Sequence, residues 1–116
     1  MKFKIEAKEN VHVISLEGNL LGDYDNNGFL EEINRLIDEH HASLFILNLS
    51  KLENLNSSGL GVLITILTRS RKLGGDTVIT GIPEKINKLL IITKLNTVFH
   101  FADSVELAKK MLLKTV

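Results

Sequence analysis

The sequence contains no cysteine among its 116 residues. Disulfides, thiol catalysis and cysteine-rich zinc sites are therefore excluded, and the composition fits a reducing cytoplasm, where we expect the protein to lie. Aromatic residues are also scarce, with five Phe, one Tyr and no Trp, so the stacking platform of a single-strand nucleic acid binder is missing. The formal net charge is zero, which gives no attraction to a polyanion. We expect no nucleic acid partner.

Long hydrophobic runs are absent as well. The most apolar stretch, Leu60–Leu67, is far shorter than the roughly 20 residues of a membrane span, and it contains Gly61 and Thr65. The N-terminal residues lack the apolar core of a signal peptide. No repeat, linker or low-complexity tract divides the chain. We therefore expect one soluble domain over residues 1–116.

Alternating apolar and polar residues at the start of the chain predict two strands, over 2–8 and 11–17. Glu9 and Asn10 between them predict a tight turn, which makes the pair a hairpin. Gly18 is expected to end the second strand. Residues 19–28 are rich in Asn, Asp and Gly, so they are expected to form a loop.

Hydrophobic periodicity and the positions of glycine and proline divide the rest of the chain into helices and strands. The expected order is a helix over 29–38, a buried strand over 44–47, a loop over 51–56, a helix over 57–73 ended by Gly74-Gly75, a strand over 77–80, a helix from Pro83 to Leu90, a strand over 98–101 and a helix over 104–113. This alternation predicts an α/β fold, with a mixed sheet of about five strands, an antiparallel opening hairpin and about four helices packed against it.

The stretch from Asn56 to Leu63 joins a buried strand to a helix through a polar turn. A helix N-terminus presents free N–H groups and a partial positive charge, so an anion on Ser57 would be stabilised there. Glycine inside a helix costs about 0.5–1 kcal/mol relative to alanine. Gly59 and Gly61 therefore suggest that another element or a partner protein approaches the backbone closely. Simple capping is the alternative, because Asn and Ser are common cap residues.

This stretch resembles the signature of the STAS domain family, which includes the anti-sigma-factor antagonists. The family pattern is Asp-Ser-Ser/Thr/Ala-Gly-Leu-Gly at a strand-to-helix turn, and its phosphate acceptor maps to Ser57. The resemblance extends over most of the chain. It includes the opening hairpin, the strand-like Leu47-Asn48-Leu49, the glycines after the helix, and Lys94-Leu95 where the family tends to place Gly-Leu.

The resemblance implies a protein-binding switch and not an enzyme, with no cofactor, metal or catalytic residue. A serine kinase of the anti-sigma type would bind unmodified Ser57, its phosphorylation of Ser57 would expel it, and a phosphatase would reset the switch. The expected partner-binding residues are Asp23, Asp25, Asn56, Ser57, Ser58, Gly59 and Leu60. The same family resemblance leaves two alternatives, an accessory subunit of a transporter and a signalling scaffold component whose Ser57 is never modified.

Two departures from the family pattern affect this expectation. Asn56 stands where the family has aspartate; it caps a helix equally well but carries no negative charge. A kinase that needs that carboxylate would phosphorylate Ser57 poorly. The loop over 19–27 also differs from the usual Gly-Glu-Leu-Asp, and Asp23 or Asp25 would have to replace its acidic residue.

Other chemistry receives less support from the sequence. Residues 23–28 match the front half of a calcium loop, but its twelfth position holds Asn34 instead of glutamate, which favours a plain polar loop. His40 and His41 are adjacent and do not share a helix face, so they do not suggest a metal pair. His12 and His100 are expected at surface or hydrogen-bonded positions. No residue is positioned by the pattern as a base for Ser57, so a hydrolase is not predicted.

Overall fold

The structure, a computed structural model, describes residues 1–21 and 28–114. Its strands form one sheet in the order β1-β2-β3-β4-β5. The first pair is antiparallel and the other three pairs are parallel, as the hairpin and the alternating helices predict. The elements are β1 (Lys2–Lys8), β2 (Val11–Leu20), α1 (Phe29–His40), β3 (Leu44–Leu55), α2 (Ser57–Lys72), β4 (Asp76–Thr80), α3 (Glu84–Ile92), the 3-10 helix η1 (Leu95–Thr97), β5 (His100–Ala102) and α4 (Val105–Lys114). The expected α/β fold class is confirmed.

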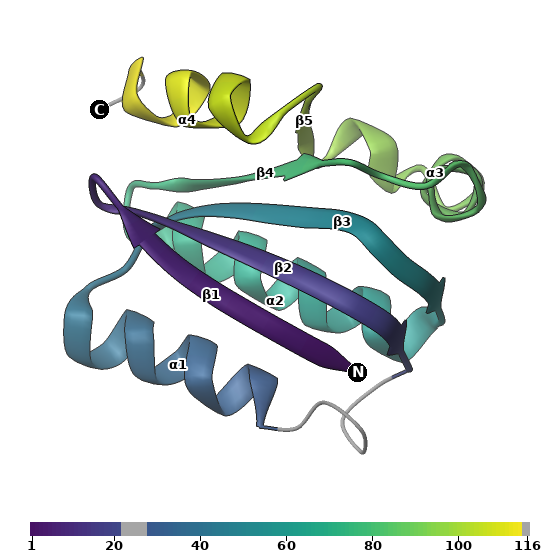
Figure 1. Cartoon of the computed structure of the whole chain (residues 1–116), viewed down its shortest axis with the longest axis horizontal. Coiled ribbons are helices and arrows are strands. Elements are labelled where there is room, and N and C mark those ends of the chain that lie inside the picture. The colour runs from purple at the N-terminus through teal and green to yellow at the C-terminus, as the bar shows by residue number, and fades with distance from the viewer. Residues whose placement is uncertain (22–27, 115–116) are drawn as a thin grey trace.

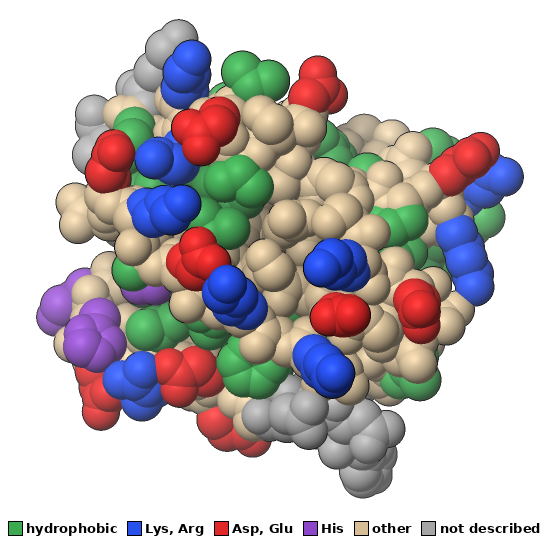
Figure 2. All heavy atoms as spheres, viewed as in Figure 1, with side chains coloured by type: hydrophobic (Ala, Val, Ile, Leu, Met, Phe, Trp, Pro, Cys, Tyr) green, Lys and Arg blue, Asp and Glu red, His purple; other side chains and the backbone are tan. Residues whose placement is uncertain are grey.

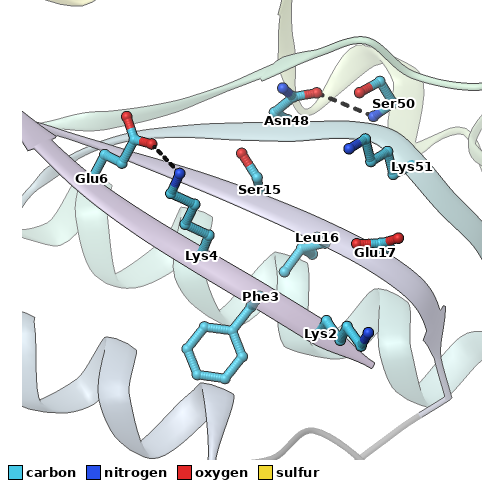
Figure 3. Close-up of a pocket in the computed structure, with 10 residues that line it drawn as sticks. All are labelled: Lys2, Phe3, Lys4, Glu6, Ser15, Leu16, Glu17, Asn48, Ser50 and Lys51. Atoms are coloured by element: carbon cyan, nitrogen blue, oxygen red, sulfur yellow. Dashed lines mark hydrogen bonds and ion pairs between the residues drawn. The ribbon is translucent and has the colours of Figure 1, made fainter.

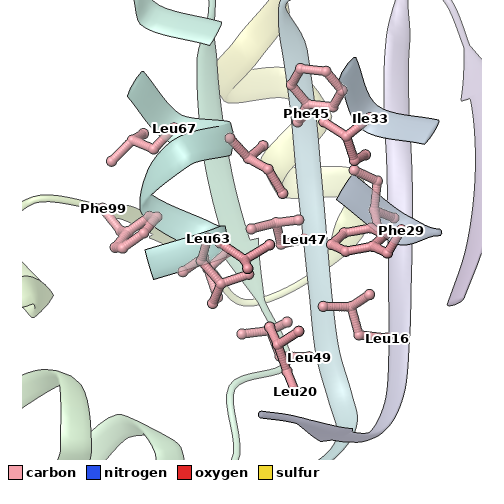
Figure 4. Close-up of a cluster of buried hydrophobic side chains, with 14 of the residues drawn as sticks. Leu16, Leu20, Phe29, Ile33, Phe45, Leu47, Leu49, Leu63, Leu67 and Phe99 are labelled. Atoms are coloured by element: carbon pink, nitrogen blue, oxygen red, sulfur yellow. The ribbon is translucent and has the colours of Figure 1, made fainter. Parts of the chain in front are cut away.

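Helices cover both faces of the sheet (Figure 1). Helices α1 and α2 pack on one face, where Phe29, Leu63 and Leu67 meet Phe45 and Leu47 of the central strand (Figure 4). Helix α4 packs on the other face. The α3 helix lies beyond the carboxyl end of β4 (Figure 1). The core is therefore two layers of side chains, one on each side of β3.

The face under α4 changes character along the strands. Ala108 and Leu112 of α4 pack on Val13 and Ile46, in the first halves of β2 and β3, and on Val78, in the middle of β4. The following residues on the same face are polar and include Ser15 and Asn48, which pair in the register of β2 and β3. Alternation along a strand points every second side chain to one face, so this switch from apolar to polar explains why α4 covers only part of it.

Local turn chemistry was predicted correctly. Glu9 and Asn10 have φ values of 52° and 69°, and positive φ at both central residues is the signature of a type I′ hairpin turn. Gly74 has φ 83° and follows α2, as expected of a helix-ending glycine. Lys94 has φ 62°, a left-handed conformation that glycine adopts at lower cost than other residues.

Two expectations about β2 and β3 were wrong. Gly18 does not end β2; it has φ 97° and lies between two register shifts, so it accommodates an irregularity within a strand that continues to Leu20. The predicted loops at 19–20 and 51–55 are strand, because parallel pairing continues as far as Leu20 and Leu55. Pairing between distant segments overrides the polar composition that suggested loops.

The C-terminal boundaries also differ from those expected. Pro83 is the N-cap residue of α3 and not its first helical residue, and that helix continues past Leu90 to Ile92. The predicted strand over 98–101 is shifted, because β5 begins at His100 and a 3-10 helix precedes it. Phe99 is 3% exposed and joins the core on the α1–α2 side without belonging to a strand. An apolar run of this length does not distinguish a strand from a buried loop residue.

Candidate functional site

The candidate site is the turn that joins β3 to α2. Asn56 has extended backbone angles and is the N-cap residue: its side-chain Oδ1 accepts a hydrogen bond of 2.8 Å from the Gly59 N–H. Its backbone carbonyl accepts the first helical hydrogen bond, 2.8 Å from the Leu60 N–H. The Asn56 side chain thus satisfies one donor, the Gly59 N–H, that the start of a helix would otherwise leave free, as the sequence predicts.

Ser57 is the first residue of α2 and its side chain is exposed. Since Asn56 makes the cap, the Ser57 hydroxyl is not needed for it, and within residues 1–21 and 28–114 that hydroxyl has no hydrogen bond. Ser104 provides a contrast, because its Oγ accepts from the Leu107 N–H at 3.2 Å and caps α4. The first turn of α2 has no acidic residue. A phosphate on Ser57 would meet the positive end of the helix dipole with no opposing carboxylate in that turn.

The two glycines of the turn have different surroundings. A Cβ at Gly59 would lie 2.0 Å from the carbonyl oxygen of Leu20, so the helix can approach the end of β2 only without a side chain there. A Cβ at Gly61 would meet no atom within 4 Å beyond the adjacent helix backbone, and the residue is exposed. The expected close approach is therefore confirmed at Gly59, where the neighbour is β2. No contact in the described structure explains Gly61.

Leu20, the last residue of β2, and Leu21, which follows it, are part of the site and were not predicted from the sequence. The Asn56 side-chain Nδ2 donates to the carbonyl oxygen of Leu21 at 3.0 Å, and its backbone N–H donates to Leu20 at 3.4 Å. The Leu21 side chain is 44% exposed. The expected parallel pairing of the two strands could have placed these residues at the site, because the carboxyl ends of neighbouring parallel strands meet at one edge of the sheet. The assumption that Gly18 ended β2 concealed it.

The predicted partner-binding residues fall into three groups. Asn56, Ser57 and Ser58 lie together on the surface. Gly59 and Leu60 are buried directly behind them, with Leu60 only 6% exposed, so their contribution is to packing under the turn. Asp23 and Asp25 lie outside the described residues, and so does most of the segment that resembles a calcium loop. Among the residues that the structure describes, no three His, Asp or Glu side chains are grouped to hold a metal ion.

Away from this turn, a hollow of about 330 Å³ lies on the polar part of the open sheet face (Figure 3). Its walls include Ser15, Asn48 and Lys51, and Lys4 pairs with Glu6 at 2.9 Å. That hydrogen bond, followed by the charge of Lys4, lowers the pKa of Glu6. Figure 2 shows acidic and basic side chains intermixed on this face. Three lysines (Lys2, Lys4 and Lys51) and two glutamates (Glu6 and Glu17) line the hollow, so their charges largely cancel and give it little selectivity for an ion.

The histidines lie at the end of the sheet opposite the turn that joins β3 to α2. The His12 ring lies 5.9 Å from the ring of Phe45. His12 is half-buried, and its Nδ1 is buried with no hydrogen-bond partner among the described residues, so the expected surface or hydrogen-bonded position does not hold for that atom. Burial lowers the pKa of His12, and the nearby charge of His40 lowers it further. His100 is exposed and its Nε2 lies 3.3 Å from Asp76, in agreement with the expectation.

The helices between residues 28 and 114 are too short or too polar for any of them to cross a lipid bilayer.

Comparison with solved structures places this fold among known proteins. RsbS of Moorella thermoacetica, in a variant with serine replaced by glutamate, aligns with a TM-score of 0.79 at 22% identity over 98% of this chain and 97% of the other. The Bacillus cell fate determinant SpoIIAA in its phosphorylated form gives 0.75 at 20% identity over 95% and 99%. A sulfate transporter family protein of Wolinella succinogenes gives 0.70 at 15% identity over 95% and 88%. At these identities the likeness shows the fold.

The family is identified by a sequence match to a family model. The STAS domain model matches residues 2–108, which include the whole sheet and the Asn56–Gly61 turn. The expected resemblance is thereby confirmed, and the chain belongs to the STAS domain family.

Proposed function

We propose that this chain is a protein-binding switch of the anti-sigma-factor antagonist type, controlled by phosphorylation of Ser57. Its partner is a serine kinase that also acts as the anti-sigma factor, and a phosphatase reverses the modification. The role requires no cofactor, metal or catalytic residue from this chain, and it places the chain in the cytoplasm. SpoIIAA, which has the same fold, has been solved in a phosphorylated form.

The observation that carries the proposal is that Asn56 makes the helix cap and leaves the Ser57 hydroxyl out of it. Asn56 caps the helix, and the neighbouring hydroxyl is exposed and makes no hydrogen bond to residues 1–21 or 28–114. A serine that the helix cap does not need and that is open to solvent is a suitable phosphate acceptor. The absence of the family's carboxylate at Asn56 implies a kinase that does not depend on it.

Gly61 supports a protein partner at this surface. Glycine in a helix interior costs about 0.5–1 kcal/mol relative to alanine, and no contact among residues 1–21 and 28–114 requires it at this position. One exposed face of α2 consists of Ser57, Gly61, Thr65 and Thr68. The side chains on this face are small and uncharged. A partner can therefore approach the helix backbone closely.

The switch follows from charge. A phosphoserine adds about 1.5 to 2 negative charges at neutral pH. In the free chain, the helix N-terminus and solvent stabilise this group. In an interface without basic partners, it would have to lose its water, and the cost of desolvation opposes binding. Phosphorylation should thus weaken association without unfolding the domain.

The test uses wild-type protein and the Ser57→Ala and Ser57→Asp variants as baits in lysate of the source cells. We expect wild type and Ser57→Ala to capture a serine kinase that Ser57→Asp does not capture. With that kinase and ATP, intact mass spectrometry should show one added phosphate on wild type and none on Ser57→Ala. The Ser58→Ala variant is the matched control and should still gain the phosphate. Equal binding of wild type and Ser57→Asp would refute the switch.

A transporter subunit is the second candidate, because the Wolinella succinogenes protein of the sulfate transporter family has the same fold. Capture of a membrane transporter by all three baits, with no phosphate added to Ser57, would favour this alternative. Phosphate-free Ser57 together with a soluble multiprotein complex would instead favour a scaffold component.

A further inference from the structure

Asn56 makes contacts in two directions from one side chain. Its Oδ1 accepts from the Gly59 N–H at 2.8 Å, and its Nδ2 donates to the Leu21 carbonyl oxygen at 3.0 Å. The first contact is the helix cap, which aspartate would make equally well. The second needs a donor, and an ionised carboxylate has none. The amide at this position therefore performs a task that the family's aspartate cannot perform when it is ionised.

The second contact ties the end of β2 to the start of α2. Two further features act at the same place: the Asn56 N–H bonds to Leu20, and the bare backbone of Gly59 lies against the Leu20 carbonyl. Leu21 directly follows Leu20 in the chain, and its side chain is 44% exposed although it is a large hydrophobic group. The hydrogen bond to its carbonyl fixes the backbone that carries this side chain next to the turn that carries Ser57.

We propose that Asn56 is a positioning residue that holds Leu21 and Ser57 together as one partner-binding surface, and that this tie requires an amide. Leu21 provides an apolar anchor for the partner that binds the surface with unmodified Ser57. The shared-surface part of this inference rests on the proposed function, whereas the tie itself is a property of the isolated chain.

The tie is tested by NMR on the full chain, through the carbonyl carbon shift of Leu21. We expect Asn56→Asp to change this shift at neutral pH, because the donor is lost. We also expect the shift to return toward the wild-type value in acid, because a protonated carboxyl can donate again. Asn96→Asp introduces the same charge at an exposed site in η1 and should change nothing. An unchanged Leu21 shift in Asn56→Asp, or no recovery in acid, would overturn the tie.

The shared surface is tested with the kinase captured by wild-type protein. Leu21→Ala should weaken that binding by about 5- to 30-fold, the range that corresponds to loss of one well-packed apolar contact. Leu73→Ala is the matched control, since Leu73 is 51% exposed at the opposite end of α2 and should bind like wild type. Equal affinity of Leu21→Ala and wild type would overturn the shared surface. Failure to capture any partner would overturn the proposed function and the shared surface together, while the carbonyl shift would still decide the tie.

Discussion

Gly59 and Gly61 lie two residues apart in one helix, yet a methyl group added at each would meet different surroundings. At Gly59 it would lie 2.0 Å from the Leu20 carbonyl oxygen, which is backbone and has little freedom to move. We expect Gly59→Ala to lower the free energy of unfolding by about 2 kcal/mol or more. At Gly61 the space is open. Gly61→Ala should raise the same quantity by about 0.5–1 kcal/mol.

Urea denaturation of the two variants and of wild type measures both effects. The same Gly61→Ala variant should bind the partner more weakly even though it is more stable, because the methyl group occupies the approach to the helix backbone. Tighter or equal binding would remove Gly61 from the partner surface, and a stable Gly59→Ala would contradict the described packing against Leu20.

His12 should make stability depend on pH. Its pKa is lowered, first by burial and then by the charge of His40, so the unfolded chain takes up this proton more readily than the folded chain. Stability is therefore lost as the pH falls through the ordinary histidine pKa, which is 6.5. We expect the free energy of unfolding to decrease between about pH 7.5 and pH 5.5, and to decrease less in His12→Phe. Equal slopes for the two proteins would show that the buried Nδ1 does not couple to folding.

At the scale of single elements, α4 offers two adjacent leucines in contrasting positions. Leu112 is 1% exposed and packs on the sheet, whereas Leu113 is 39% exposed. Leu112→Ala removes buried methyl groups and leaves a cavity, so it should cost about 2–4 kcal/mol of unfolding free energy. Leu113→Ala should stay within about 0.5 kcal/mol of wild type. Chemical denaturation of both variants makes the comparison; similar losses would mean that α4 does not pack as described.

Elements with local signals were predicted well from sequence. The Glu9-Asn10 turn, the helix-ending Gly74 and the amphipathic α1 each depend on residues close together in the chain. The full lengths of β2 and β3 were missed because they depend on pairing between segments some 35 residues apart, such as Leu20 with Leu55. Polar residues in those strand ends are tolerated because hydrogen bonds between strands satisfy the backbone.

In the candidate site, too, residues of a local motif were predictable and residues brought in by distant contacts were not. Asn56, Ser57 and the glycines belong to one short motif, so their place at a helix start could be predicted. Leu21 could not be, because its role depends on a contact with a residue 35 positions away. The sequence also could not show that Gly59 is needed for packing while Gly61 is not. That difference depends on the position of Leu20, which lies against Gly59 only.

At the scale of the whole molecule, β3 lies between β2 and β4, and its first four residues are covered on both faces. Phe45 and Leu47 face α1 and α2, while Leu44 and Ile46 face α4. The sheet edges are different: β5 has three residues and pairs on one side only, and β1 carries exposed lysines that discourage pairing with another chain.

This arrangement predicts a gradient of backbone protection across the sheet. Amide hydrogens of Phe45, Ile46 and Leu47 can exchange only when both covering layers are lost, so they should exchange with the free energy of global unfolding. Those of β5 should exchange through smaller openings that leave β3 intact. Hydrogen exchange followed by NMR at increasing low denaturant would separate the two, because only exchange by global unfolding shows the full denaturant dependence. Protection in β5 equal to that in β3 would mean that the edge and the centre open together, and the site at the end of β3 could then not change locally without the whole sheet.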